Sequence, residues 1–164
     1  MHRLRKTRTI LFTFAFLAVV ATAFTAAQQS PPPTTHAPRA QLARSVVPTR
    51  LLALRWARTQ HGKWYCWGGT GPACYDCSGL VTTAYQQAGI DLPRTTYEML
   101  ASPHLVPVPA AQARPGDLAF YGSGHVELVT VWPHTTFGSL EPGTRIGWHH
   151  WSQWWHPTMF FHVK

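Results

Sequence analysis

The sequence is poor in acidic residues and therefore carries a net positive charge. Six Asp and Glu stand against 14 Lys and Arg, for a formal net charge of +8 at pH 7. Four of the basic residues lie in the first 27 positions, so the rest of the chain carries about +4 (10 − 6). No long run of Lys and Arg follows. That charge is too diffuse for a nucleic-acid-binding protein, although it would favour an anionic polymer.

The sequence also lacks a hydrophobic run long enough for a membrane-spanning helix. Its apolar segment, residues 10–24, is shorter than the roughly 20 residues that cross a bilayer. A basic stretch at residues 3–8 precedes this segment, and the small residues Thr25-Ala26-Ala27 follow it. This order predicts a secretory signal over residues 1–27. An uncleaved membrane anchor is the alternative.

Proline and threonine cluster in the next segment, residues 28–47. The run Pro31-Pro32-Pro33 favours extended polyproline conformation and offers little to bury, so we expect a linker. Residues 48–164 contain no internal repeat. They are numerous enough for one compact domain with its own core.

Hydrophobic residues at helical spacing predict helices over residues 48–61 and 77–88, each followed by a glycine. The pattern Thr95-x-x-Glu98 predicts a capping box and a short third helix. The second half of the chain favours strands instead, at residues 118–121, 125–131, 135–139, 144–148 and 158–163. Helices first and strands second predict an α+β domain, with helices packed on one side of a mostly antiparallel sheet.

Cysteine is scarce, with Cys66, Cys74 and Cys77 only. Outside the cytosol two of them would tend to pair, which leaves one thiol over. A bond between Cys66 and Cys74 would close a short glycine-rich loop and leave Cys77 free. A bond between Cys74 and Cys77 is the alternative, and it would leave no nucleophile.

The free thiol would have a histidine as its partner in the strand at residues 125–131. Cys77 falls in the first turn of its predicted helix if Asp76 is the N-cap, where the helix dipole and free N–H groups favour a thiolate. His125 opens the predicted strand and could take the proton. Each residue alone is more often structural, Cys77 as a small core residue and His125 as a strand histidine. Together they predict a nucleophile and its base.

Five motifs in order support this interpretation. They are Trp64-Tyr65-Cys66-Trp67-Gly68-Gly69, Asp76-Cys77-Ser78-Gly79-Leu80-Val81, Gly89-Ile90-Asp91-Leu92-Pro93-Arg94, Arg114-Pro115-Gly116-Asp117-Leu118 and Gly124-His125-Val126. Together they resemble the NlpC family of bacterial cell-wall cysteine peptidases, over roughly residues 50–148. The resemblance implies a papain-like fold.

The resemblance also implies roles for particular residues. Cys77 matches the family's nucleophile and His125 its base. Tyr65 matches a tyrosine that lines the site and helps the oxyanion hole. Asp76 and Ser78 match positions that contact the free amino end of a short stem peptide in related peptidases. Family members commonly cut the bond between γ-D-glutamyl and a diamino acid in peptidoglycan.

One position departs from the family pattern. The family orients its histidine with a third polar residue on the next strand, usually histidine, and that position falls on Gly138 here. The nearest polar candidates are Glu127, Ser139 and Glu141. Glu127 lies on the same predicted strand face as His125 and could contact the ring, although an ordinary exposed carboxylate is the alternative.

The segment 148–156 is rich in tryptophan and histidine. It could form an aromatic cover on the sheet, a sugar-stacking surface, or a metal site made by His149, His150 and His156. We favour the cover, and expect no metal, because no cysteine or carboxylate set completes such a site.

We therefore expect a secreted thiol endopeptidase that acts on peptidoglycan stem peptides, outside the cell or at the cell wall. We expect it to work as a monomer, without cofactor, nucleic acid or membrane contact once the signal is removed. The alternatives are a weak or inactive module that binds wall peptides, a related thiol amidase or acyltransferase, and a membrane-anchored structural protein.

Overall fold

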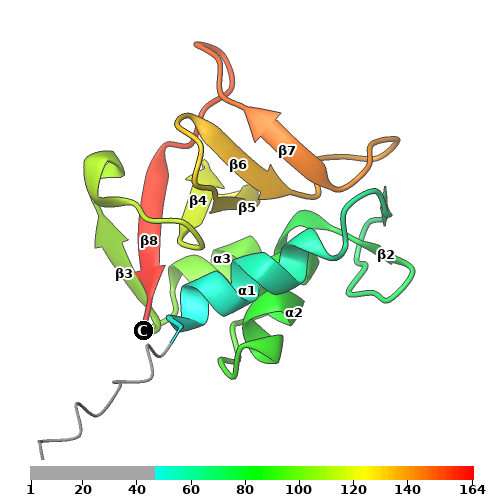
Figure 1. Cartoon of the computed structure of the whole chain (residues 1–164), viewed down its shortest axis with the longest axis horizontal. Helices are drawn as coiled ribbons and strands as arrows, with labels where there is room; N and C mark the ends of the chain where they lie inside the picture. Colours follow the sequence, from blue (N-terminus) through cyan, green and yellow to red (C-terminus); the bar gives the residue numbers. More distant parts are fainter. Residues whose placement is uncertain (1–46) are drawn as a thin grey trace, which may run out of the picture. The chain divides into compact units, whose positions relative to one another are not determined.

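Helices come first along the chain and most strands come after them (Figure 1). The computed structural model describes residues 47–164, so the predicted signal and nearly all of the predicted linker lie outside the described residues. The helices are α1 (Thr49–Arg58), α2 (Cys77–Gln87) and α3 (Thr96–Leu100), with a short 3-10 helix at Ala110–Gln112. No helix of residues 47–164 has the length and apolar character that a bilayer span requires.

The main sheet has six strands, and every neighbouring pair in it is antiparallel. Its order is β3 (Leu105–Val108), β8 (Met159–Val163), β4 (Leu118–Tyr121), β5 (His125–Val129), β6 (Thr135–Gly138) and β7 (Gly147–His150). Two further strands, β1 (Trp64–Tyr65) and β2 (Cys74–Tyr75), pair in parallel as a separate ribbon. The expected α+β architecture with a mostly antiparallel sheet is confirmed.

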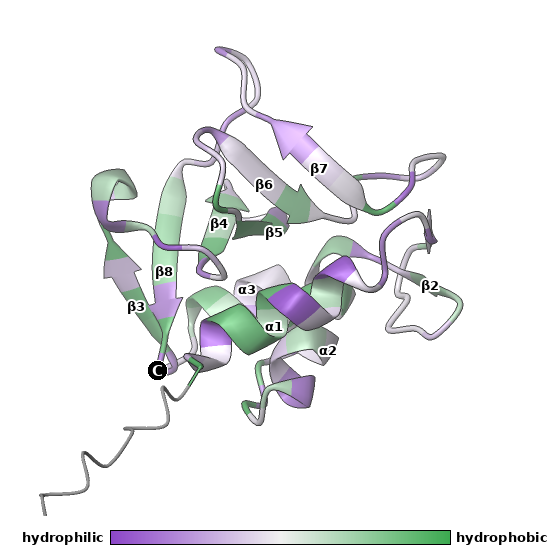
Figure 2. Ribbon diagram, viewed as in Figure 1, coloured by the Kyte–Doolittle hydropathy of each residue, from purple (hydrophilic) through white to green (hydrophobic). Residues whose placement is uncertain are grey.

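The main core lies between the helices and one face of the sheet. Helix α2 packs against α1 and against β5, and the side chains of Leu80, Val81, Val126 and Leu128 are fully buried there. Hydrophobic colour is strong on β4 and β5 in the middle of the sheet, whereas edge strand β7 is hydrophilic (Figure 2). Burial of these side chains anchors the start of α2 beside the start of β5.

A second, smaller cluster covers the other face of the sheet. Ala119 on β4, Val129 on β5 and Phe160 on β8 are buried together, and Trp151 packs against them. Because side chains alternate along a strand, residues 125, 127 and 129 of β5 all belong to this second face. The sheet is therefore covered on both sides, and polar side chains on the second face can be buried.

Several predicted boundaries are wrong. The first helix ends at Arg58, and the chain then makes a turn to Gly62, whose φ is +82°. Strand β5 ends at Val129, because the Thr130 hydroxyl bonds the carbonyl of Thr135 and turns the chain. The strand expected at residues 144–148 lies at Gly147–His150.

Three strands were not predicted from the sequence. Strands β1 and β2 have two residues each, too few to show a pattern. Strand β3 contains Pro107, which disfavours a strand reading except at an edge, and β3 is an edge strand.

Candidate active site

The site is built around the start of α2. Asp76 is the N-cap, and its Oδ1 accepts the backbone N–H of Gly79 at 2.6 Å. Cys77 is therefore the first residue of the helix, partly exposed, with a free thiol in the described chain. The unpaired N–H groups and the dipole of this helix end favour negative charge at Cys77.

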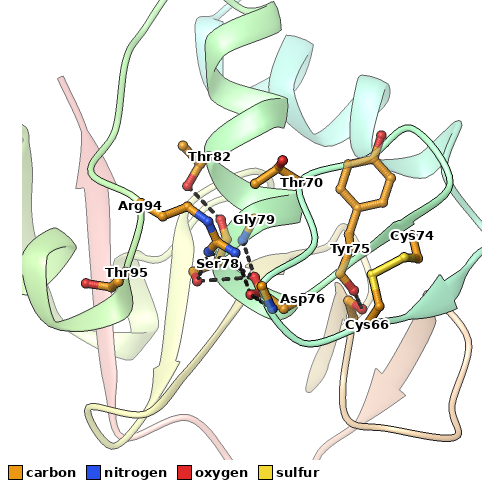
Figure 3. A network of polar contacts seen from close by, with 12 residues as sticks. Cys66, Thr70, Cys74, Tyr75, Asp76, Ser78, Gly79, Thr82, Arg94 and Thr95 are labelled. Atoms are coloured by element: carbon orange, nitrogen blue, oxygen red, sulfur yellow. Dashed lines mark hydrogen bonds and ion pairs between the residues drawn. A yellow bond between two sulfur atoms is a disulfide. The ribbon is translucent and has the colours of Figure 1, made fainter.

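A disulfide joins the other two cysteines, Cys66 and Cys74, with an S–S distance of 2.03 Å (Figure 3). The pairing that leaves Cys77 free is thus confirmed, and the alternative bond between Cys74 and Cys77 is wrong. The closed loop lies directly against α2. A side chain at Gly79 would collide with the carbonyl oxygen of Gly69, so glycine is required for this close approach.

Arg94 holds the Asp76 carboxylate from the segment that follows α2 (Figure 3). Its Nη2 donates to Asp76 Oδ2 at 2.5 Å, and its Nη1 donates to Asp76 Oδ1 at 3.1 Å and to Ser78 Oγ at 2.9 Å. The backbone N–H of Gly68 also donates to Oδ2, at 2.9 Å. Both carboxylate oxygens of Asp76 thus already accept hydrogen bonds from the protein itself. Nothing in the sequence alone marks Arg94 as part of the site, although it ends the motif Gly89-Ile90-Asp91-Leu92-Pro93-Arg94.

His125 opens β5 immediately after the turn at residues 122–124 and lies beside Cys77. Burial by itself would lower the pKa of His125, but hydrogen bonding and negative charge from Cys77 and Glu127 raise it to about 9. Its Nε2 is 3.2 Å from Glu127 Oε1. Nδ1 is therefore the ring nitrogen that does not face Glu127.

Glu127 is the one of the three polar candidates that contacts His125. Its side chain is 0% exposed, and its Oε1 also lies 2.6 Å from Nδ1 of His149 on β7. Burial raises the pKa of Glu127, but hydrogen bonds and positive charge from His125 and His149 outweigh this and lower it. Ser139 instead donates to the carbonyl of Tyr75, and Glu141 is exposed in a turn.

Tyr65 and a cleft complete the surroundings of the thiol. Burial, with the negative charges of Cys77 and Asp76, raises the pKa of Tyr65, so its hydroxyl keeps its proton at neutral pH. A cleft of about 490 Å³ opens beside Cys77. Exposed aromatic rings of Trp67 and Tyr97 line it, together with Arg94 and Ser78.

Two tryptophans of the segment 148–156 form the expected aromatic cover. Trp155 stacks on Tyr121 with ring centroids 4.5 Å apart and lies 5.6 Å from the ring of His125, and Trp151 packs against Phe160. Trp154 is exposed.

The three histidines of this segment do not converge on a metal site. His149 contacts Glu127, His150 contacts the Thr135 hydroxyl, and His156 contacts the Ser152 carbonyl. Within residues 47–164, no group of three or more His, Cys, Asp or Glu is placed to hold a metal ion.

Comparison with known proteins points to one family. Residues 62–137 match the family model described as "NlpC/P60 family". A "Probable endopeptidase p60" of Listeria seeligeri is 47% identical over 70 residues, which cover 42% of this chain. That match covers only 13% of the relative's own length.

Solved structures agree with this match. The NlpC/p60 domain of the peptidoglycan hydrolase SagA is 26% identical, with a TM-score of 0.63, and the alignment covers 71% of this chain and 100% of that one. The peptidoglycan hydrolase RipB from Mycobacterium tuberculosis is 24% identical, with a TM-score of 0.62, covering 71% and 65% of the two chains. At this level of identity RipB supports the fold alone. The expected papain-like fold is confirmed.

Proposed function

Because the chain carries an NlpC/P60 domain, we propose that it is a thiol-dependent endopeptidase that cleaves amide bonds in peptidoglycan stem peptides. The observation that carries this proposal is the free thiol of Cys77 at the start of α2, beside the ring of His125. The substrate class is supported by a relative named as an endopeptidase and by a structural neighbour, at 26% identity, named as a peptidoglycan hydrolase.

The reaction begins with the sulfur of Cys77. With a pKa of about 9, His125 holds a proton at neutral pH, and an imidazolium beside a thiol favours the nucleophilic thiolate. The thiolate attacks the carbonyl carbon of the amide and forms a C–S bond. The negative charge that develops on the carbonyl oxygen is met by N–H groups at the start of α2 and by the protonated hydroxyl of Tyr65.

Breakdown of this intermediate uses the proton held by His125. His125 donates its proton to the nitrogen of the leaving amine as the C–N bond breaks, which leaves an acyl-thioester on Cys77. Water then attacks the thioester while His125 takes up a proton from it. The C–S bond breaks, the carboxylic acid leaves, and the thiolate and imidazolium of the starting state are restored.

Substrate binding is assigned to the cleft beside Cys77. Asp76 and Ser78 remain our prediction for contact with the free amino end of a stem peptide. Because both oxygens of Asp76 already accept bonds from the protein, an ammonium group would have to join or displace Arg94. The side chain of Arg94 is 35% exposed and lines the cleft, so it could itself meet a peptide carboxylate.

We propose that the protein acts outside the cytosol, after removal of residues 1–27. The disulfide between Cys66 and Cys74 supports an oxidising compartment, because such bonds are rare in the cytosol. Residues 28–47 would then serve as a linker ahead of the peptidase domain. We further propose that the domain acts as a monomer and needs no cofactor.

Digestion of purified peptidoglycan tests the activity. Wild-type protein should release muropeptides with new termini, identified by mass spectrometry, whereas Cys77→Ala should release none above background. Cys77→Ala keeps the disulfide between Cys66 and Cys74, so unreduced peptide mapping and circular dichroism can show that the variant is folded. A Cys77→Ala variant with full activity would exclude the mechanism.

The same assay separates the alternatives. Wall binding by wild-type protein without any released product would indicate a binding module. Products cut between sugar and peptide would indicate an amidase, and products joined to an added amine would indicate an acyltransferase. Either result would overturn the endopeptidase assignment.

A further inference from the structure

Three polar side chains lead away from the thiol: His125 and His149, both partly buried, and between them the fully buried Glu127. The inference drawn from them rests on the catalytic roles proposed above for Cys77 and His125. We propose that Glu127 and His149 act as positioning residues for His125. Glu127 fixes the orientation and tautomer of the imidazole, and His149 fixes Glu127. The space for Glu127 is provided by Gly138, the position where the family resemblance leads one to expect a polar side chain.

The contacts assign the protons along this chain. One oxygen of Glu127, Oε1, meets His125 Nε2 at 3.2 Å and His149 Nδ1 at 2.6 Å. A carboxylate can only accept hydrogen bonds, so both ring nitrogens must donate. With the Nε2 proton held by Glu127, Nδ1 is the nitrogen that gains and loses the catalytic proton. Once His125 has given that proton to the leaving amine, the neutral ring has an unprotonated Nδ1, which is the form that takes a proton from water in the second step.

Strand register explains why Glu127 can reach both rings. In the β5–β6 pair, Leu128 faces Phe137, and continuing by one pair places Glu127 opposite Gly138. A Cβ atom at Gly138 would lie 2.6 Å from Cγ and 2.8 Å from Oε1 of Glu127. The carboxylate therefore occupies the volume of the missing side chain. Across the bare backbone of Gly138 it meets His149, which stands on the same sheet face of β7.

Because the Glu127 carboxylate is buried, it depends on the charged and polar groups that face it. The Glu127 side chain is 0% exposed, and its second oxygen, Oε2, is buried with no hydrogen-bond partner within residues 47–164. An ionised carboxylate in such a place must be paired. The groups that face it are His125 on its own strand, His149 on β7 and Tyr121 on β4, where burial and the charge of Glu127 raise the tyrosine's pKa. Trp155 covers this side by stacking on Tyr121.

Three substitutions test the proposal, with wall hydrolysis and alkylation of Cys77 by iodoacetamide as readouts. Glu127→Gln keeps the shape and removes the charge. It should lower kcat/KM by at least about tenfold, since loss of the orienting carboxylate of a serine-protease triad costs up to about 10⁴-fold. It should also lower the rate of alkylation at pH 7, because Glu127 raises the pKa of His125 and the imidazolium beside the sulfur favours the reactive thiolate.

Gly138→Ala should displace the carboxylate without removing any polar group, and should lower the alkylation rate at pH 7 by several fold. Its matched control is Gly147→Ala on β7, directly opposite Gly138, where an added Cβ would meet nothing closer than 3.8 Å. The control should keep the wild-type rate. Equal rates for the two glycine variants would contradict the role of Gly138.

His149→Phe tests the outer member of the chain. It should lower kcat/KM about three- to tenfold, within the range of coupling between residues in contact, whereas His150→Phe, next in sequence on the opposite face of β7, should not. Because His149 acts through Glu127, its effect should vanish when Glu127 is already Gln. An equal loss in both backgrounds, or a loss of stability alone, would overturn the positioning role.

Alkylation keeps this test separate from the proposed function. If the wild-type protein cuts no peptidoglycan, the endopeptidase assignment fails, yet the iodoacetamide profile still reports whether His125 activates Cys77. An unchanged alkylation rate at pH 7 in Glu127→Gln would refute the positioning proposal, whatever the wall assay gives.

Discussion

Replacing Arg94 with Met should destabilise the domain, because Arg94 is the cation that neutralises Asp76 at the start of α2. Methionine keeps much of the length and apolar surface of the side chain and removes only its charge and donors. Three donated bonds are lost, two to the Asp76 carboxylate and one to Ser78 Oγ. Asp76 retains the backbone N–H groups of Gly68 and Gly79, so the helix keeps its cap.

The expected loss of stability follows from how exposed the Asp76 and Arg94 side chains are. Breaking a fully buried ion pair costs roughly 3–5 kcal/mol, whereas an exposed pair contributes about 1 kcal/mol or less. The Asp76 side chain is 11% exposed and the Arg94 side chain 35%, which places this pair between the two limits. We therefore expect the free energy of unfolding to fall by about 2 kcal/mol.

Urea denaturation at pH 7 measures this change directly. Arg94→Lys keeps the charge without the two-pronged geometry and should lose about half as much. The matched control is Arg55→Met on the exposed side of α1, which should stay within about 0.5 kcal/mol of wild type. A loss for Arg94→Met no larger than that of the control would refute the idea that the pair stabilises the start of α2.

Two further predictions concern pH and processing. The folded-state pKa of His125 lies above the usual 6.5, at about 9, so its proton is fully held below pH 6.5 and lost as the pH rises through about 9. Hydrolysis, which needs that proton for the leaving amine, should fall with an alkaline limit near pH 9 in a profile of kcat/KM; a limit near 7 would contradict it. If residues 1–27 are a signal, mass spectrometry of protein from culture fluid should find Gln28 at the N-terminus, whereas an intact N-terminus in the membrane fraction would indicate an anchor.

Local sequence patterns were enough to locate Cys77 and His125, the proposed nucleophile and base. Asp76 could be recognised as an N-cap, and Cys77 as the first residue of a helix, because capping depends on neighbours only a few positions away. The capping box of Thr95 and Glu98 was found for the same reason. Strand β4 was predicted with its observed bounds. The short ribbon of β1 and β2 left no comparable signal, since each strand has only two residues.

The sequence by itself thus determined the α+β order of elements, and it predicted a helix-terminal Cys77 and a strand-initial His125 as partners. Only the tertiary structure decided how Glu127 and His149 are arranged next to His125. The same-strand alternation made Glu127 a candidate, but its contact with His149 depends on the register of β5, β6 and β7 and on the gap at Gly138. Such contacts join residues far apart in the chain, and they form only once the strands have aligned and the aromatic cover has excluded water.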